Sequence, residues 1–256
     1  MRFSVITCTY NAAEVLQRTL DSVQSQSHPD VLHIIIDGMS KDSTMSLVRS
    51  YEAEQQHEVT VVSEPDKGLY DAMNKGLRMA AGDYVVFLNA GDTFANEHTL
   101  ADIAHQLKDI ADPADLPGVI YGNTDLYDID GNRLGQRRLQ PPETLSWRSF
   151  RHGMLVCHQA FYARTDIAAA TSYDLTYHLS ADVDWCIRIM KETEKRQLPL
   201  HNSHMTLCHY LEGGMSVQNH RASLMERFNV MRRHYGFFST LCMHAWFIIR
   251  QIRSKK

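Results

Sequence analysis

Four short apolar segments, separated by segments with helical spacing, restrict the fold of this chain more than any other feature. They recur at intervals of roughly 25–30 residues, which is the spacing of β-α-β units. Such units have a right-handed crossover and bring their strands together in parallel. The sequence therefore predicts an α/β fold with a mostly parallel central sheet flanked by helices. The predicted strands are Phe3–Thr7, Val31–Ile36, Glu58–Ser63 and Tyr84–Leu88.

Helices are expected between these strands. Asn11, with Glu14 three residues later, has the pattern of a helix cap. Asp42 or Ser43 is expected to cap the second helix. The third helix is expected over Leu69–Met79, where apolar side chains return at helical spacing. A chain of 256 residues is long enough for one large α/β domain or two small ones.

Polar or small residues follow the four predicted strands. In an open parallel sheet the carboxyl ends of the strands share one edge, and ligands bind beyond it. Asp37 and Asp92 each come at the end of an apolar stretch and are expected at this edge. A single aspartate in such a position often only caps a turn. Several polar groups that converge on one edge favour a binding site.

The common phosphate-binding motifs are absent from the sequence. Neither G-x-G-x-x-G after the first strand nor G-x-x-x-x-G-K-[ST] occurs, which argues against a dinucleotide-binding fold and a P-loop NTPase. A divalent cation held by carboxylates is the other common way to bind a diphosphate. Asp92 can supply one oxygen ligand, and Ala90 and Gly91 leave room for a diphosphate near the backbone.

Composition places the chain among ordinary soluble proteins, with 44% hydrophobic and 22% charged residues. The first residues read as a strand rather than as a secretion signal, so a cytoplasmic protein is expected. The cysteines lack a C-x-x-C pair, which argues against a zinc module and fits a reducing compartment. They are expected to be buried packing residues, and they are Cys8, Cys157, Cys186, Cys208 and Cys242.

A second candidate site lies further along the chain. Ser180 is expected to cap a helix that has Asp182 and Asp184 in its first turn. The helix dipole favours acids there, so a structural role is the alternative to catalysis. Upstream, "GVIYGNTDLYDIDGNRLGQRR" predicts two strands joined by a tight turn at residues 130–132, and "HQAFYAR" predicts another strand.

Histidines near this site lack a metal-binding pattern. His201 and His204 are three residues apart near a predicted strand, where such residues point to opposite faces, so surface or structural roles are favoured. His158 is a candidate for contact with an acceptor or donor. His209 precedes the glycine loop "LEGGMS", which we expect could close over a diphosphate, and it is a weaker candidate for ligand contact.

Four segments in this order resemble a family-2 inverting glycosyltransferase with the GT-A fold: "SVITCTYN", "IIIDGMSKDST", "EPDKGLYDAMNKGLRMAAGDYVVFLNAGD" and "ADVDWCIRI". The nearest likeness is to small enzymes of bacterial exopolysaccharide, capsule and O-antigen pathways, including colanic-acid-type transferases. The resemblance covers roughly residues 3–215. It implies a Rossmann-like GT-A domain over 1–218, with a nucleotide-sugar-binding half at about 1–115 and an acceptor-side half at 116–218.

The resemblance also implies a role for each matching residue. Asp37 would bind the base, typically uracil, and Asp182 would be the general base that deprotonates the acceptor. Asp184 would be a helper or a structural cap. "NAGD" stands where the family has its metal motif, and only Asp92 keeps a carboxylate there, as ligand to Mn²⁺ or Mg²⁺. The remaining nucleotide-sugar contacts would be Thr7, Tyr10, Asn11, Glu14, Lys67, Asn74 and Asn89.

The function that follows is transfer of one sugar from a nucleotide-sugar donor, a UDP-sugar, to a saccharide acceptor in surface polysaccharide synthesis. The Q-x-x-R-W pattern of processive members is absent, so one addition per acceptor is expected. Two alternatives stay open. One is a sugar nucleotidyltransferase, although "TCTYNAAE" lacks the glycine-rich phosphate loop such enzymes need. The other is an inactive nucleotide-binding or membrane-adaptor module.

Residues 219–256 are expected to form a basic amphipathic helical tail. From Arg221 onward there are eight Lys and Arg and a single acid, Glu226. The 16 mostly apolar residues between Arg233 and Arg250 are fewer than the ~20 that a membrane span needs. They favour a helix in the interface of the inner face of the cytoplasmic membrane, which suits a polyprenyl-diphosphate-linked acceptor. A docked last helix or a homodimer contact is the alternative, and no nucleic acid is expected among the partners.

Overall fold

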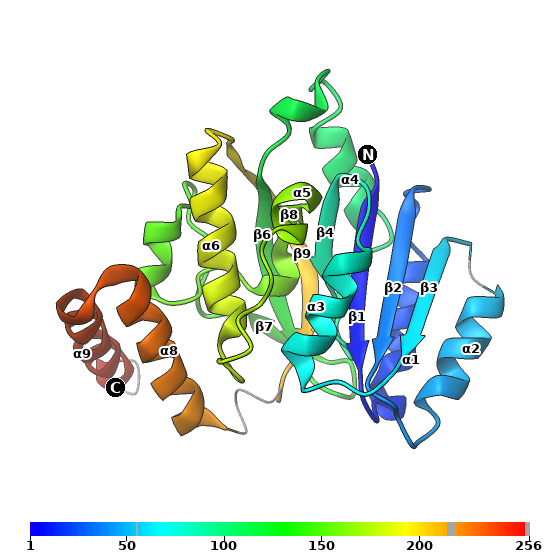
Figure 1. Ribbon diagram of the computed structural model, residues 1–256, viewed down its shortest axis with the longest axis horizontal. Coiled ribbons are helices and arrows are strands. Elements are labelled where there is room, and N and C mark those ends of the chain that lie inside the picture. The colour runs from blue at the N-terminus through cyan, green and yellow to red at the C-terminus, as the bar shows by residue number, and fades with distance from the viewer. Residues whose placement is uncertain (55, 214–218, 254–256) are drawn as a thin grey trace.

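One mixed sheet of nine strands forms the centre of the computed structural model, which describes residues 1–54, 56–213 and 219–253 (Figure 1). The strand order is β3-β2-β1-β4-β8-β6-β9-β5, and β7 pairs with β6. The strands are β1 (Phe3–Thr9), β2 (Val31–Asp37), β3 (Glu58–Ser63), β4 (Tyr84–Phe87), β5 (Thr93–Phe94), β6 (Val119–Tyr127), β7 (Arg133–Gln136), β8 (Phe161–Arg164) and β9 (Leu200–Leu211).

Helices cover both faces of the sheet. α3 packs on one face, and α1 and α2 enclose Ile35 on the other (Figure 1). The helices before residue 200 are α1 (Ala13–Gln24), α2 (Thr44–Glu54), α3 (Leu69–Met79), α4 (Thr99–Gln106), α5 (Thr165–Ala169) and α6 (Ala181–Lys195), with 3-10 turns η1 (Pro113–Asp115), η2 (Trp147–His152) and η3 (His158–Ala160).

The predicted parallel half of the sheet is confirmed. β3, β2, β1 and β4 are neighbours and run parallel, and α3 has the predicted bounds. Every residue of β1 and β2 is buried. Burial on both faces explains why these strands read as continuous apolar runs rather than as alternating ones.

The second half of the chain continues the same sheet. β8 runs antiparallel between β4 and β6, and β9 lies parallel to β6. The predicted hairpin is present as β6 and β7, which pair antiparallel. The strand predicted from residue 158 begins later, because His158–Ala160 form a 3-10 turn before β8 starts at Phe161.

Two helices follow the sheet, α8 (His220–Tyr235) and α9 (Phe237–Arg253). α8 lies beside α6 and buries Val230 and Met231, whereas α9 lies outside it (Figure 1). Along the described chain, neither of them nor any other helix has the length and hydropathy of a membrane span. The cysteines are buried as predicted except for Cys242 on α9, for which that prediction is wrong because it lies on the outer helix.

A buried histidine links β1, β2 and α2 beneath the carboxyl edge of the sheet. The Thr7 hydroxyl donates to Leu88 O at 2.8 Å, so its oxygen accepts from His33 Nε2 at 2.9 Å. His33 Nδ1 then accepts from the Tyr51 hydroxyl at 2.8 Å. Burial, followed by the nearby His57, lowers the pKa of His33 to about 3. The neutral imidazole is therefore the form that fits this network.

We expect the free energy of unfolding to fall as the pH is lowered from about 6.5 toward 3. The unfolded chain takes up a proton on His33 in this range, and the folded chain does not, so each pH unit costs up to about 1.4 kcal/mol. Urea unfolding at several pH values measures the slope. His33→Gln should flatten it, whereas the exposed His98→Gln serves as the control. Equal slopes in all three proteins would contradict the prediction.

Candidate active site

The carboxyl ends of β1, β2 and β3 form the first part of the site. Thr9, Asp37 and Ser63 stand side by side in the sheet register. Asp37 is fully buried, and its Oδ2 accepts from Ser63 Oγ at 2.6 Å and from the Ser40 N–H at 3.1 Å. Within the described residues, Oδ1 has one longer contact, 3.3 Å to the same N–H, and so keeps capacity to accept a hydrogen bond.

Tyr10, Gly38 and Asp66 meet above this carboxylate. A Cβ on Gly38 would lie 2.5 Å from Asp66 Oδ2 and 3.3 Å from Tyr10 Cδ2, so a side chain at this position would push the Asp66 carboxylate aside. The Tyr10 ring is 60% exposed, which leaves it available to stack on a planar ligand. The sequence reasoning missed Asp66, although it lies in the same "EPDKG" turn as the predicted Lys67.

Asn11 does not cap α1, and that prediction is wrong. Its φ of 48° turns the chain, and its Oδ1 accepts the Lys41 N–H at 2.8 Å. The N–H groups at the start of α1 are satisfied from the next loop instead. Ala12 donates to Thr44 Oγ1 at 2.8 Å and Ala13 to Asp42 Oδ2 at 3.2 Å.

Asp42 also accepts the Thr44 N–H at 3.0 Å, as predicted for a cap of α2. One carboxylate therefore serves the first turns of both helices. Glu14, which lies in the first turn of α1, is exposed.

Lys67 and Asn74 have different surroundings on the α3 side of the edge. Lys67 is exposed in the turn before α3, and its backbone N–H donates to Asp71. Asn74 is buried and makes two bonds to the backbone of Tyr173, at 3.0 Å to its carbonyl and 2.7 Å from its N–H. Its amide holds the 171–174 segment against α3.

Asn89 and Asp92 form the turn after β4, closed by a bond from Asp92 N to Asn89 O at 2.9 Å. Asp92 is only 3% exposed. Its Oδ2 accepts from Gln159 Nε2 at 2.7 Å and its Oδ1 from Leu211 N at 2.9 Å. Burial outweighs these bonds and raises the pKa of Asp92 to about 7. Asn89 Oδ1 is buried and finds no hydrogen-bond partner within the part of the chain that the structure describes.

Gly91 brings β9 close to this turn. With a φ of 99°, it would place a Cβ 2.5 Å from Leu211 Cδ2. The space beside Gly91 is thus taken by Leu211, rather than left open as the sequence suggested for a diphosphate.

Asp182 lies in the first turn of α6, at the same edge of the sheet. It is half-buried, and its Oδ1 accepts from the Tyr70 hydroxyl at 3.3 Å. Burial, followed by Asp182 itself, raises the pKa of Tyr70 well above its ordinary value, so the phenol stays protonated and donates. Tyr70 is the second residue of α3 and closely follows the turn that carries Asp66 and Lys67. This contact joins the donor-side strands to the helix of the second half.

His158 and Tyr210 both feel the charge of Asp182, and Tyr210 also feels that of Asp92. His158 is buried, and its Nε2 has no hydrogen-bond partner among residues 1–54, 56–213 and 219–253. Burial lowers the pKa of His158, while Asp182 opposes this change. The pKa of Tyr210 is raised by burial first and then by Asp92 and Asp182, so both acids act on one region. Arg137, which the sequence reasoning missed, adds a positive charge there and donates to Met154 O at 2.7 Å.

His209 lies in β9, opposite Thr93 of β5 and Asp125 of β6. Its ring is 4.3 Å from that of Tyr127, and burial lowers its pKa. Of the loop expected to close after it, residues 211–216, the part from Gly214 lies outside the described residues.

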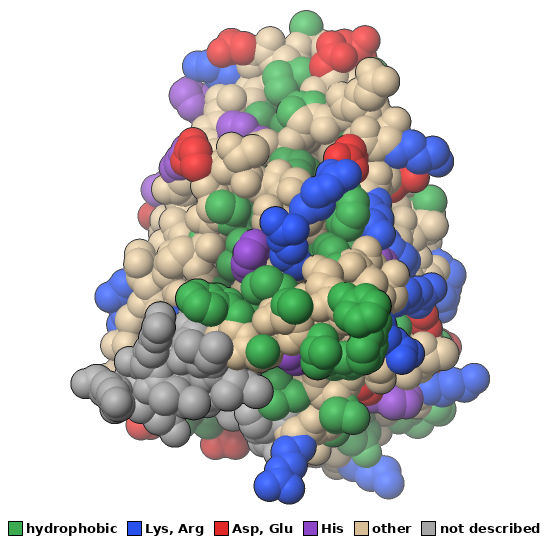
Figure 2. Space-filling model, turned by 90° about the vertical axis from the view of Figure 1, so that its left-hand side faces the viewer, with side chains coloured by type: hydrophobic (Ala, Val, Ile, Leu, Met, Phe, Trp, Pro, Cys, Tyr) green, Lys and Arg blue, Asp and Glu red, His purple; other side chains and the backbone are tan. Residues whose placement is uncertain are grey.

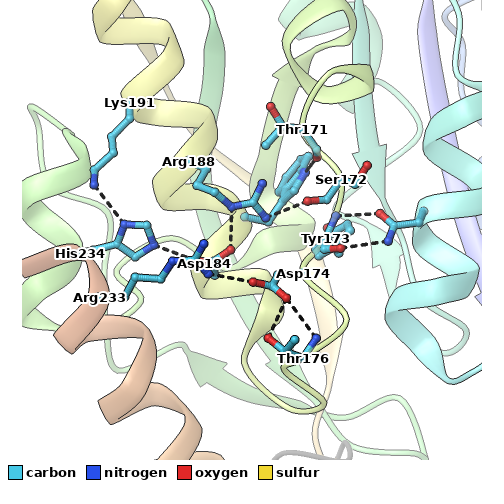
Figure 3. Close-up of polar contacts among 12 residues, drawn as sticks. Thr171, Ser172, Tyr173, Asp174, Thr176, Asp184, Arg188, Lys191, Arg233 and His234 are labelled. Atoms are coloured by element: carbon cyan, nitrogen blue, oxygen red, sulfur yellow. Dashed lines mark hydrogen bonds and ion pairs between the residues drawn. The ribbon is translucent and has the colours of Figure 1, made fainter.

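Asp184 points away from this edge, toward α8 (Figure 3). It is fully buried; Oδ2 accepts from Arg188 Nε at 2.6 Å and Oδ1 from His234 Nε2 at 2.7 Å. Lys191 Nζ donates to the other ring nitrogen of His234 at 3.0 Å. Burial alone would raise the pKa of Asp184, but His234 and Arg188 hold it below its ordinary value. This geometry fits the structural role rather than direct contact with a ligand.

Known proteins resemble this chain in sequence. The family model described as Glycosyl transferase family 2 matches residues 4–169. An uncharacterized glycosyltransferase of Mycobacterium tuberculosis is 29% identical over 249 residues, which cover 95% of this chain and 88% of the relative. A PGL/p-HBAD biosynthesis glycosyltransferase of Mycobacterium bovis is 31% identical over 219 residues, which cover 84% of this chain and 78% of the relative.

Solved structures resemble it in fold. TarS of S. aureus, residues 1–349, superposes with a TM-score of 0.69 at 17% identity, over 96% of this chain and 72% of that one. TarS has also been solved with UDP-GlcNAc. The mannosyltransferase PcManGT of Pyrobaculum calidifontis, in complex with GDP-Man and Mn²⁺, gives a TM-score of 0.60 at 19% identity, over 95% of this chain and 74% of that one. These likenesses agree with the predicted GT-A fold.

Proposed function

This chain belongs to glycosyltransferase family 2, and from that membership we propose that it moves one sugar from a UDP-sugar to a saccharide on a polyprenyl diphosphate, with inversion. As a glycosyltransferase it is not a sugar nucleotidyltransferase. The observation that carries the proposal is the position of Asp182. Its half-buried carboxylate lies at the carboxyl edge of the sheet, joined through Tyr70 to the donor-side turn.

The donor would bind across β1, β2 and β3. Asp37 Oδ1 can accept the N–H of a uracil, and Tyr10 can stack on the ring. The UDP-GlcNAc complex of TarS supports a uridine donor, and the GDP-Man complex of PcManGT makes guanosine the alternative to test. Asn11 and Lys67, in the adjoining turns, and Glu14, at the start of α1, are proposed as further contacts.

The chemical step would be a single displacement. The acceptor oxygen attacks the anomeric carbon while Asp182 takes up the hydroxyl proton. The bond from the anomeric carbon to the diphosphate oxygen breaks, and its electron pair leaves with the nucleoside diphosphate. One displacement inverts the configuration, so no second nucleophile is needed. The Tyr70 hydroxyl would hold the Asp182 carboxylate in its orientation.

A divalent cation is proposed at the turn after β4. No group of three His, Cys, Asp or Glu side chains converges to hold a metal within the described parts of the chain. The turn does offer oxygen ligands, the Asp92 carboxylate and Asn89 Oδ1, which has no hydrogen-bond partner among the residues that the structure describes. Oxygen donors suit Mn²⁺ or Mg²⁺, and the diphosphate would complete the ligand set. Such an ion supplies Lewis-acid stabilisation of the leaving diphosphate. Arg137 would add a fixed positive charge to the same region.

Turnover tests the function directly. The full chain is incubated with UDP- and GDP-sugars in turn, a synthetic polyprenyl-diphosphate-linked sugar and Mn²⁺, and the release of nucleoside diphosphate is measured. Acceptor-dependent release from one UDP-sugar is expected, with an inverted linkage in the product by NMR. Release from GDP-sugars alone would overturn the proposal that the donor is a uridine nucleotide. No release from any donor would favour the inactive nucleotide-binding module.

We expect Mn²⁺ to tighten UDP binding by at least about tenfold, or 1.4 kcal/mol, in calorimetry against EDTA. Asp92→Asn should lose this gain and keep the affinity measured in EDTA. Asp37→Ala should weaken binding under both conditions, because its partner is the base and not the diphosphate. Equal UDP affinity in Mn²⁺ and EDTA would contradict the metal role of Asp92.

The outer side of α8 and α9 is proposed to bind the inner face of the cytoplasmic membrane. Figure 2 looks onto this side and shows hydrophobic side chains gathered on its lower half, with Lys and Arg around them. Phe238 is 80% exposed and Met225 69% exposed, and Phe237, Leu241 and Trp246 are also exposed. Exposed aromatic side chains beside basic ones are typical of an interfacial helix. A second copy of this chain is the other occupant to test.

Co-sedimentation with vesicles checks the membrane proposal. Because α8 is packed against α6, the chain should be truncated after Gly236, which removes α9 alone. We expect the full chain to bind anionic vesicles and the truncated chain to bind less, since each basic residue near an anionic surface is worth about 1 kcal/mol. Binding should fall at high salt and on neutral vesicles. Equal binding of both chains would contradict the role of α9, and a truncation that converts a dimer into a monomer would favour the second copy.

A further inference from the structure

Glu226, on α8, binds the backbone of the segment that leads into α6. Its carboxylate accepts the N–H of His178 at 2.9 and 3.1 Å, that of Leu179 at 2.7 Å and that of Ser180 at 3.0 Å. Three consecutive donors on one carboxylate make a specific site for a negative charge. Glu226 is the single acid after Arg221, so this position departs from the basic character of its surroundings.

These three N–H groups stand directly before the helix that carries Asp182. α6 begins at Ala181, and Asp182 is its second residue. Ser180 flanks the first residue of α6, and His178 and Leu179 come before it, so Glu226 binds the backbone that leads into the helix and not the N–H groups of the helix itself. Here residue 181 is a buried alanine, and the Ser180 hydroxyl donates away from the helix, to Ser223 O of α8 at 3.3 Å. α8 therefore holds the start of α6 from outside, through Glu226 on the N–H groups of 178–180 and through Ser223 O on the Ser180 hydroxyl.

We propose that Glu226 is a positioning residue for the transfer reaction, which holds the 178–180 backbone and thereby the place of Asp182 at the edge of the sheet. This inference rests on the proposed role of Asp182 as the base. A base must lie within hydrogen-bond reach of the acceptor hydroxyl, and an error of 1 Å in such a group can cost about 100-fold in rate. The Asp182 side chain has one hydrogen bond within the described residues, the 3.3 Å bond from the Tyr70 hydroxyl, and the Asp182 backbone makes a further bond to Tyr70.

The effect of Glu226 is expected to be local, because α8 has other attachments. Its far end is held by His234, which donates to Asp184 at 2.7 Å, and by Arg233, which donates to Asp174 at 2.7 Å (Figure 3). Val230 and Met231, on α8 itself, are also buried. Removing the Glu226 carboxylate should therefore free the 178–180 backbone without releasing the helix.

Two substitutions at position 226 test this proposal, with Asn229→Ala, exposed on the same helix, as the matched control. Glu226→Ala removes every acceptor, and Glu226→Gln keeps one oxygen and the same reach. With the best UDP-sugar and the synthetic acceptor, kcat should fall by about 10- to 100-fold in Glu226→Ala and by less in Glu226→Gln, while the donor KM changes less than about twofold. Should Glu226→Ala not fold, Glu226→Gln decides.

Amide hydrogen exchange of the peptide over 176–184, measured without substrate, gives a second readout that does not depend on activity. Exchange at 178–180 should be faster in both Glu226 variants and unchanged in Asn229→Ala. An inactive wild-type chain would overturn the proposed function and leave this readout intact. Unchanged exchange, a kcat within about twofold of the wild type, or a loss confined to KM would overturn the role of Glu226.

Discussion

Asp182→Asn is expected to lower kcat by about 100-fold or more and to leave both the fold and UDP affinity as in the wild type. The amide keeps the shape of the carboxylate and can still accept from the Tyr70 hydroxyl, but it cannot take up the acceptor proton. Rates of nucleoside diphosphate release at saturating donor and acceptor measure the loss. Calorimetric titration with UDP, together with thermal unfolding, shows that donor site and fold are retained.

The matched control is Asp102→Asn. Asp102 is also an acid in the first turn of a helix, α4, but it is exposed. Its substitution should leave turnover unchanged. A turnover of Asp182→Asn within about threefold of the wild type would contradict its role as the base. The buried His158, whose Nε2 has no hydrogen-bond partner within the described chain, would then be the next group to test.

Asp184→Ala is expected to have the opposite profile, a large loss of stability. Asp184 is fully buried between Arg188 and His234, and removing it leaves both side chains without their carboxylate. Breaking a buried ion pair in this way typically costs roughly 3–5 kcal/mol. The midpoint of urea unfolding measures the cost. A loss below about 1 kcal/mol would contradict the structural role and would return Asp184 to the candidates for catalysis.

The two aspartates serve as controls for each other, since they lie two residues apart in one helix turn. Asp182→Asn should keep the unfolding midpoint and lose turnover, whereas Asp184→Ala should shift the midpoint. Their side chains point in different directions, one toward Tyr70 of α3 and one toward His234 of α8. A helix advances about 100° per residue, so side chains two apart lie on nearly opposite faces.

The two helices of the tail differ in how they pack on the rest of the chain. α8 contributes Glu226 and His234 to the surroundings of α6 and buries Val230 in the main hydrophobic core. α9 carries the exposed Phe238 and Trp246 on the outer surface. The sequence predicted one basic amphipathic segment over 219–256, because composition and charge do not distinguish a helix that docks from one that stays outside.

The four strands of the parallel half, their order of appearance and the residues at their ends could be read from the sequence by itself. An apolar run between turn residues reports burial directly, and the 3.6-residue period reports a helix, which is why α3 matches its predicted bounds. Asp37, Asp92 and Asp182 were found in the same way, as carboxylates at the ends of local patterns. The departure of Asn11 from its predicted cap shows the limit of such patterns, since the bonds that replaced it come from a loop about thirty residues away.

Only the tertiary structure decided which of these groups meet and what each one does. Asp92 accepts from Gln159 and Leu211, Asn74 binds the backbone of Tyr173, and Glu226 binds N–H groups 46 to 48 residues before it. No period or spacing contains these pairs, because they form when elements distant in sequence pack side by side. Local sequence fixes the direction in which a side chain leaves its own helix or strand. Its hydrogen-bond partner depends on which other element the packing of the core brings within about 3 Å.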